Sequence, residues 1–160
     1  MLLMATITLE AKGLDKLIRK LQAASRERVF IDALNSGVAH LKHWIDENRL
    51  SGRPGLIHRT GHLKRMVMPI AAKRIGDVIQ ARVNAGAIYS RIHEFGGTIV
   101  PKNKPFLAWK DPDSGKWRFA KKVTIPARPF MGPALRDKDN QQFVMNELIM
   151  GLRNAIARQE

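Results

Sequence analysis

Apolar residues first alternate with polar ones and then recur at helical spacing. The segment 5–10 alternates as a short strand does, with Ile7 and Leu9 on one face. Leucine and isoleucine then recur at helical spacing, which predicts a first helix over residues 14–24. A longer helix is predicted over 27–47, because apolar side chains return every three or four residues on one stripe: Phe30, Leu34, Val38, Leu41 and Ile45.

The middle of the chain predicts a loop and then a hairpin. Residues 49–61 are dense in glycine, proline and serine and lose all periodicity, so we expect a long mobile loop there. Two strands are predicted over 64–75 and 78–86, joined by Gly76 and Asp77 in a two-residue turn. Pro69 cannot donate a backbone hydrogen bond, so the first strand should lie at an edge or carry a bulge. The second strand should turn one set of residues to the core: Ile79, Ala81, Val83 and Ala85.

The last third of the chain predicts short elements and a final helix. We expect a helical turn over 88–95, a second hairpin between 105–109 and 117–120, and a short strand over 123–126. Gly132 and Pro133 suit the start of a helix. Its apolar stripe would be Met145, Leu148, Leu152 and Ile156.

Together these elements predict an α+β fold in a single domain over 1–160. A small antiparallel sheet would pack against the long helix of the N-terminal half and the C-terminal helix. The mobile loop 49–61 and a hairpin extension over 98–124 would extend from it.

Charge and cysteine content narrow the classes of function. The chain holds 28 Lys+Arg against 14 Asp+Glu and no cysteine, which excludes disulfides and thiolate chemistry. The stretches 48–76 and 114–136 contain no carboxylate. Such stretches are either a solvated basic surface or a face turned toward DNA or an acidic protein. The N-terminal residues do not resemble a signal peptide and no apolar run reaches membrane-spanning length, so we expect no membrane partner.

Catalytic and metal-binding patterns are missing from the sequence. The histidine pairs His40/His43 and His58/His62 lack a third ligand in a recognised pattern, so no metal site is predicted. His93 and Glu94 are adjacent and would not face each other for one proton transfer. Nucleophile elbows and phosphate-binding glycine loops do not occur. We therefore expect no enzyme activity, no cofactor and no small-molecule substrate.

Aromatic residues gather at one predicted hairpin. Trp109, Trp117 and Phe119 lie among Lys110, Lys116 and Arg118. Such a mixture could stack on bases and contact phosphates. Aromatic residues paired across a hairpin more often pack against each other, and we favour that interpretation.

Four segments, in order along nearly the whole chain, carry a resemblance. They are a strand followed by Gly13-Leu14-Asp15-Lys16-Leu17, the segment Arg59-Thr60-Gly61-His62-Leu63-Lys64, the segment Ile88-Tyr89-Ser90-Arg91-Ile92-His93-Glu94-Phe95-Gly96-Gly97, and the segment Ile125-Pro126-Ala127-Arg128-Pro129-Phe130-Met131-Gly132-Pro133-Ala134-Leu135. These resemble segments of the phage virion-morphogenesis or tail-completion proteins, including the Mu-like type, and of related head–tail connector components. Ser90 stands where alanine is common in that family.

The resemblance implies a structural phage protein without catalysis. Its implied role is tail completion or head–tail joining, as a homo-oligomeric ring at the tail end or neck of the virion, after assembly in the host cytoplasm beside other tail or connector proteins. The residues it marks as motif or subunit interface are Tyr89, Glu94, Phe95, Gly96, Gly97, Arg128, Pro129 and Phe130. Non-specific DNA contact in the lumen, or contact with an acidic partner, would fall to Arg53, Arg59, Lys102 and Lys104. The alternative function is that of a basic nucleic-acid-binding protein.

Elementary chemistry adds expectations for these segments. Gly96 and Gly97 can adopt positive φ, which suits a sharp turn beside a close neighbour. Tyr89, Phe95 and Phe130 are either core residues, which we favour, or interface contacts. Arg128 is a candidate ion-pair partner for Glu94 within the fold.

Overall fold

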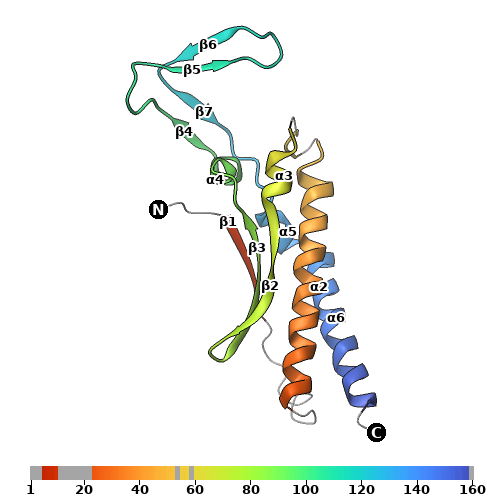
Figure 1. Cartoon of the computed structure of the whole chain (residues 1–160). Coiled ribbons are helices and arrows are strands. Elements are labelled where there is room, and N and C mark those ends of the chain that lie inside the picture. Colours follow the sequence, from red (N-terminus) through yellow and green to blue (C-terminus); the bar gives the residue numbers. More distant parts are fainter. Residues whose placement is uncertain (1–4, 11–22, 53–54, 58–59, 159–160) are drawn as a thin grey trace.

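The computed structural model describes residues 5–10, 23–52, 55–57 and 60–158, and it has the expected α+β architecture (Figure 1). Its elements, in order, are β1 (Ala5–Glu10), α2 (Ala23–Arg49), α3 (His62–Met66), β2 (Val67–Ile75), β3 (Val78–Ala85), α4 (Ser90–Phe95), β4 (Gly97–Ile99), β5 (Leu107–Lys110), β6 (Trp117–Ala120), β7 (Val123–Ile125), α5 (Gly132–Arg136) and α6 (Lys138–Ala157).

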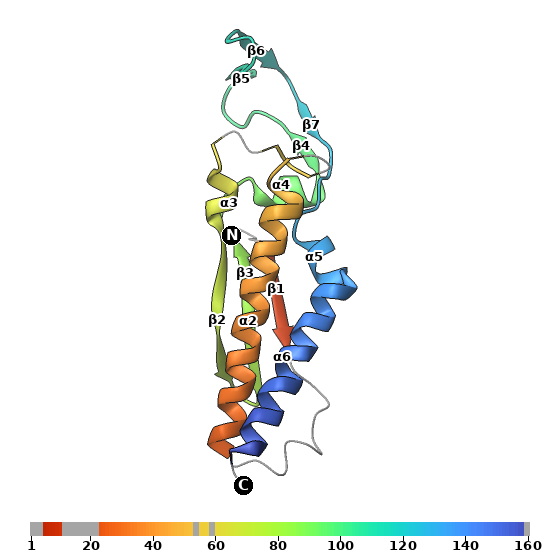
Figure 2. The ribbon, with the colours of Figure 1, turned by 90° about the vertical axis from the view of Figure 1, so that its right-hand side faces the viewer.

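The helix α2 is the central element of the fold. Its predicted apolar stripe is buried along its whole length, from Phe30 to Ile45. The helix packs against β2 and β3 and also against α6 (Figures 1 and 2). Ala23 and Ala24 already belong to α2, so the predicted break before residue 27 is wrong. The rest of the predicted first helix, 14–22, lies outside the described residues.

The described strands β1, β3 and β2 form an antiparallel sheet in that order. The predicted alternation of β3 is confirmed, because Ala81, Val83 and Ala85 are fully buried. The expectation that the strand with Pro69 lies at an edge or carries a bulge is confirmed as well: among the described strands β2 is at the edge, and its register with β3 shifts between Ile70 and Lys73. A side chain of α2 forms a hydrogen bond to this bulge: Asn35 Oδ1 accepts the Ala72 N–H at 2.7 Å.

The first residues of the predicted strand 64–75 are helical instead. Gly61 adopts φ 67°, and Arg65 N–H donates to the Gly61 carbonyl at 3.0 Å, so α3 begins directly after Gly61. The residues of α3 after its first histidine are leucine, lysine, arginine and methionine, which all favour helix. Five residues are too few for hydrophobic periodicity to distinguish helix from strand.

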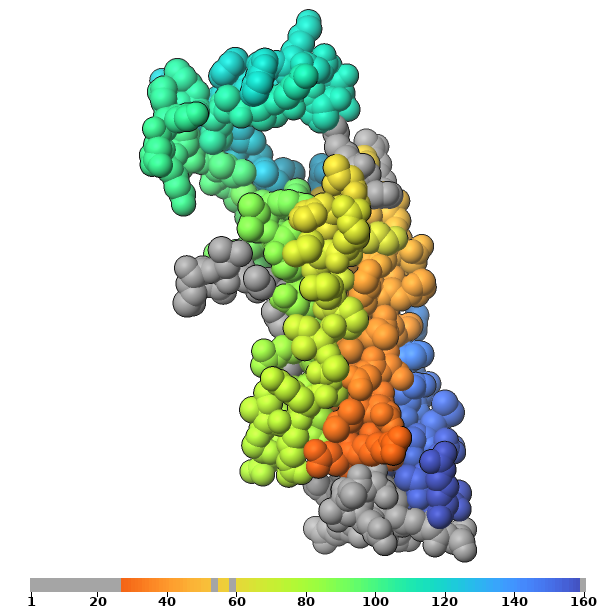
Figure 3. Space-filling view, viewed as in Figure 1, coloured from red at the N-terminus to blue at the C-terminus, as the bar shows by residue number. Residues whose placement is uncertain are grey.

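The hairpin extension stands away from the rest of the molecule. The antiparallel pair β4 and β7 leads out from α4, and the pair β5 and β6 follows at its far end. We call residues 97–125 the arm. The ribbon and the space-filling view show the β5–β6 end projecting beyond α2 and the β1–β3–β2 sheet (Figures 1 and 3). The predicted hairpin is confirmed, whereas the pairing of Gly97–Ile99 with Val123–Ile125 was not predicted.

The C-terminal segment contains two helices. α5 carries Pro133 in its first turn, as predicted, and ends before Asp137. Asp137 caps α6, because its side chain accepts the N–H groups of Asp139 and Asn140 at 3.1 Å. Leu148 and Leu152 are buried against the core, as expected, but Met145 is 45% exposed and lies off the buried stripe.

Candidate functional site

The carboxylate of Glu94 joins two segments that are far apart in the sequence. Glu94 lies in α4 and is 7% exposed. Its Oε2 accepts the N–H of Phe130 at 2.8 Å and of Met131 at 2.9 Å, and its Oε1 accepts the N–H of Gly132 at 2.8 Å. Three backbone donors at the start of α5 are thereby satisfied by one buried anion. Because hydrogen bonds to a charged acceptor are stronger than neutral ones, this contact fixes α5 against α4.

Backbone contacts next to Glu94 tighten the same junction. Arg128 N–H donates to the His93 carbonyl at 2.7 Å. Gly96 has φ 70°, and a β-carbon added there would lie 2.8 Å from the backbone nitrogen of Ala127. The expected positive φ beside a close neighbour is therefore confirmed for Gly96, and the neighbour is the 125–135 segment of the same chain.

The expected ion pair between Glu94 and Arg128 is not formed among the described residues. Glu94 is buried and its oxygens face backbone N–H groups, whereas the Arg128 residue is exposed. The reason is geometric, since the backbone turn at residues 130–132 reaches the carboxylate first. The prediction placed the two segments together correctly but assigned the wrong donors.

The remaining residues of this junction divide between core and surface. Phe130 is fully buried with Leu41 and Ile45 of α2 in the main core, as favoured from the sequence. Phe95 is 69% exposed, so the core interpretation is wrong for it. Tyr89 is partly buried, while Gly97 and Pro129 are exposed. We call residues 88–97 and 125–135 together the motif junction.

A cavity of about 320 Å³ opens beside the junction. His93 and Tyr89 line it from the α4 side, and His62 from α3. The Tyr89 and His93 rings meet edge to face, with centroids 5.7 Å apart. Burial, and secondarily the positive charge of Arg128, lower the pKa of His93 below its ordinary value of 6.5. Leu50 and Leu56, from the predicted loop, also line the cavity and are buried in the core.

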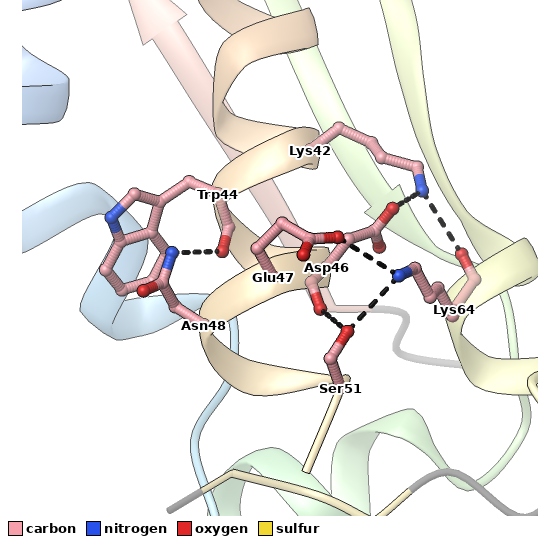
Figure 4. Close-up of polar contacts among 7 residues, drawn as sticks. All are labelled: Lys42, Trp44, Asp46, Glu47, Asn48, Ser51 and Lys64. Carbon is pink, nitrogen blue, oxygen red and sulfur yellow. Dashed lines mark hydrogen bonds and ion pairs between the residues drawn. The ribbon is translucent and has the colours of Figure 1, made fainter.

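A polar network ties the end of α2 to α3, and its Lys64 also lines this cavity (Figure 4). Lys64 Nζ lies 3.3 Å from Glu47 Oε1 and 3.2 Å from Ser51 Oγ. Ser51 in turn donates to the Asp46 carbonyl, and Lys42 pairs with the Asp46 carboxylate. Since the Lys64 ammonium group is shared between a carboxylate and a hydroxyl, the network acts as a tether that holds α3 in place.

A larger hollow of about 1000 Å³ lies between α2 and α6. Its charged lining residues include Arg28, Asp32, Glu147 and Arg158. None of the predicted site residues contributes to it, so it stands apart from the motif junction.

The structure describes two of the four basic residues predicted to contact DNA or an acidic partner. Lys102 and Lys104 are exposed on the arm between β4 and β5, and Arg53 and Arg59 lie outside the described residues. At the far end of the arm Trp117 is 63% and Phe119 67% exposed, so the favoured packing of these aromatic residues is not what the structure shows. The described part of the chain places Lys102 and Lys104 on a different segment from the motif junction.

His40 serves a structural contact between α2 and α6. His40 Nε2 lies 2.9 Å from Asn140 Oδ1, and its ring stacks on Phe143 at 4.0 Å. Asn140 is buried and also donates to the Ala134 carbonyl, a role that sequence reasoning missed because nothing local marks it. Within the described ranges, no group of three His, Cys, Asp or Glu side chains is placed to hold a metal ion. No described helix combines the length and apolar character needed to cross a membrane.

Comparison with family models, with curated proteins and with solved structures finds no match to this chain.

Proposed function

We propose that this protein is a structural component of a bacteriophage virion that acts in tail completion or head–tail joining, as an oligomeric ring at the tail end or neck. The proposal starts from the ordered resemblance of residues 88–97 and 125–135 to that class of proteins. It assigns no catalysis to the chain.

The single observation that carries the proposal is the bond set between Glu94 and residues 130–132. The two segments with the most specific resemblance are not independent, because a buried carboxylate from one holds three backbone N–H groups of the other. A resemblance that arose by chance in two separate segments would not require them to meet. The pair therefore supports a shared structural unit in which both segments have one purpose.

The exposed apolar residues of the motif junction are consistent with a contact between subunits. Ile88 is 80% and Phe95 69% exposed at the edges of a junction that Glu94 and Gly96 make rigid. Apolar side chains held in fixed directions on a rigid support are suited to bind a neighbouring protein surface. We assign Ile88 and Phe95 to the contact between neighbouring subunits.

The decisive experiment removes the gene from the phage or prophage that carries it. We expect filled heads and tails that fail to join, or tails of abnormal end structure, in electron micrographs, with infectivity restored by the gene supplied in trans. Normal joined and infectious particles would refute the proposal.

A second experiment tests the ring directly. Light scattering and negative-stain imaging of the purified protein, alone and with tail or connector proteins of the same phage, should reveal a ring. The variant Ile88→Ser/Phe95→Ser should lose it while staying folded, because both side chains are exposed. Met150→Ser is the matched control, since Met150 is 55% exposed on α6 and away from the motif junction.

A further inference from the structure

The far end of the arm presents two aromatic rings side by side to solvent. In the β5–β6 hairpin, Lys110 lies opposite Trp117 and Ala108 opposite Phe119. Since Trp117 and Phe119 are two residues apart on one strand, their side chains share a face and their Cα atoms are about 7 Å apart. Ala108 is too small to cover its neighbour, and the two aromatic residues are 63% and 67% exposed. Exposed rings in such a row form a platform on which flat groups could stack.

The arm that carries this platform is rich in basic residues. The arm contains seven basic residues, all of them exposed: Lys102, Lys104, Lys110, Lys116, Arg118, Lys121 and Lys122. Its two carboxylates are Asp111 and Asp113. Asp111 is engaged within the hairpin, where it accepts the N–H groups of Asp113 and Ser114 and pairs with Arg118 at 3.2 Å. The arm that carries the two rings therefore has a net positive charge.

This charge disfavours a second copy of the chain as the partner of the arm. Outside the arm the chain carries the remaining 21 Lys+Arg against 12 Asp+Glu, of 28 and 14 in all. Contact between a basic arm and a basic body is repulsive unless a local acidic patch intervenes. A polyanion with flat, unpaired rings complements both the cations and the aromatic residues.

We propose that the arm binds single-stranded nucleic acid, with Trp117 and Phe119 each stacked on a base and Lys110, Lys116 and Lys121 beside the phosphates. Duplex bases are already stacked on each other, so the aromatic rings contribute only to the binding of unpaired strands. The lysines attract both forms. This site lies on other residues than the lumen contacts expected from the sequence, and it does not depend on the role in virion assembly.

Fluorescence anisotropy with a labelled oligothymidine and with a duplex of the same length tests the proposal. Trp117→Ala/Phe119→Ala should weaken binding of the single strand by on the order of 10- to 100-fold and change duplex binding by less than about twofold. Trp117→Tyr/Phe119→Tyr should retain single-strand binding, because tyrosine rings also stack. Circular dichroism and thermal unfolding should show that both double variants stay folded, since the two side chains are exposed.

A pair of charge variants separates the arm from the general basic character of the chain. Lys110→Gln/Lys116→Gln/Lys121→Gln should lower the affinity for the single strand. The slope of log affinity against log salt concentration should also become shallower, by roughly 0.7 for each phosphate that is no longer neutralised. Lys73→Gln/Lys138→Gln/Arg153→Gln removes the same charge from exposed positions outside the arm and should have a much smaller effect.

Three results would overturn the proposal. One is that the wild-type protein fails to bind the oligothymidine at about 50 mM salt, where phosphate contacts are strong. Another is an equal decrease of affinity in the two charge variants. The third is that Trp117→Ala/Phe119→Ala abolishes oligomers in light scattering while single-strand affinity is unchanged, which would make the arm a protein contact. The ring experiments test the assembly role separately, so the two proposals can fail independently.

Discussion

The side chain of Glu94 accepts the backbone N–H of Phe130 at 2.8 Å, across 36 residues of sequence. The same carboxylate also binds the next two backbone N–H groups, so its two oxygens satisfy three donors in a buried position. An amide in its place would turn an NH2 group toward at least one of these donors. The contact therefore requires a carboxylate and not only a side chain of this size.

We expect Glu94→Gln to lower the free energy of unfolding by about 1–3 kcal/mol, since one or more buried N–H groups lose their acceptor. Glu94→Ala should cost more, because all three donors then lack a partner. Urea unfolding followed by circular dichroism measures both. Glu47→Gln is the control, because Glu47 forms a partly exposed ion pair with Lys64 and its removal should cost less than about 1 kcal/mol. Equal effects of the two glutamine variants would contradict the assigned role of Glu94.

A methyl group at Gly96 should be far more damaging than one at Gly115. Both glycines have a positive φ, 70° at Gly96 and 67° at Gly115, but Gly96 also has ψ 179°, a combination that essentially only glycine adopts. A β-carbon at Gly115 would meet nothing within 4 Å, whereas one at Gly96 would lie 2.8 Å from Ala127 N. Gly115→Ala should therefore cost only the backbone strain of about 1–2 kcal/mol. Gly96→Ala should cost more, because its backbone conformation is more strained for alanine and the 125–135 segment must also be displaced. Thermal unfolding of the two variants checks this, and similar decreases in stability would show that the close approach is unimportant.

Local patterns were sufficient to predict the elements that bury one continuous face. The stripe of α2 and the alternation of β3 each extend over at least two turns or three residue pairs, so their period can be read from sequence. The turn at Gly76 and Asp77 was predictable for a different local reason, because the backbone geometry of a two-residue hairpin turn favours those residue types.

Contacts that depend on tertiary placement were not predictable in this way. The strands β4 and β7 are three residues long each and show no resolvable period. The family resemblance led us to expect contact between the segments around Glu94 and Phe130. The donors to Glu94 are backbone N–H groups, however, and these cannot be recognised from side-chain identity in a sequence. The exposure of Trp117 and Phe119 was missed because aromatic residues in a hairpin usually pack, whereas here their cross-strand neighbours, Lys110 and Ala108, are charged or small.

The bulge in β2 should depend on a single side chain of α2. The shifted register leaves Ala72 N–H without a strand partner, and Asn35 Oδ1 accepts it at 2.7 Å. We expect Asn35→Ala to destabilise the protein by about 1–2 kcal/mol, the cost of a partly buried donor without an acceptor. Asn48→Ala is the control, because Asn48 donates to the Trp44 carbonyl at an exposed site of the same helix. Hydrogen exchange should also become faster at Ala72 in the Asn35 variant, and unchanged exchange there would argue against this account.

The lowered pKa of His93 should make stability fall on the acid side of neutrality. Burial, and then Arg128, favour the neutral ring in the folded state, while in the unfolded chain it takes up a proton near pH 6.5. Between pH 6.5 and the lower pKa of the folded state, the unfolded state therefore binds more protons than the folded state. The contribution of the neutral His93 ring to the free energy of unfolding is complete above pH 6.5 and is lost as the pH falls through that window. The other charged or titratable groups around the cavity, Lys64, His62 and Tyr89, remain in place when His93→Gln is compared with wild type. Urea unfolding at a series of pH values should thus give a difference between the two proteins that is constant above pH 6.5 and changes in favour of the variant below it. Arg128→Gln should reduce this change without abolishing it, because burial is the larger cause, and a difference that stays flat with pH would rule out His93 as the titrating group.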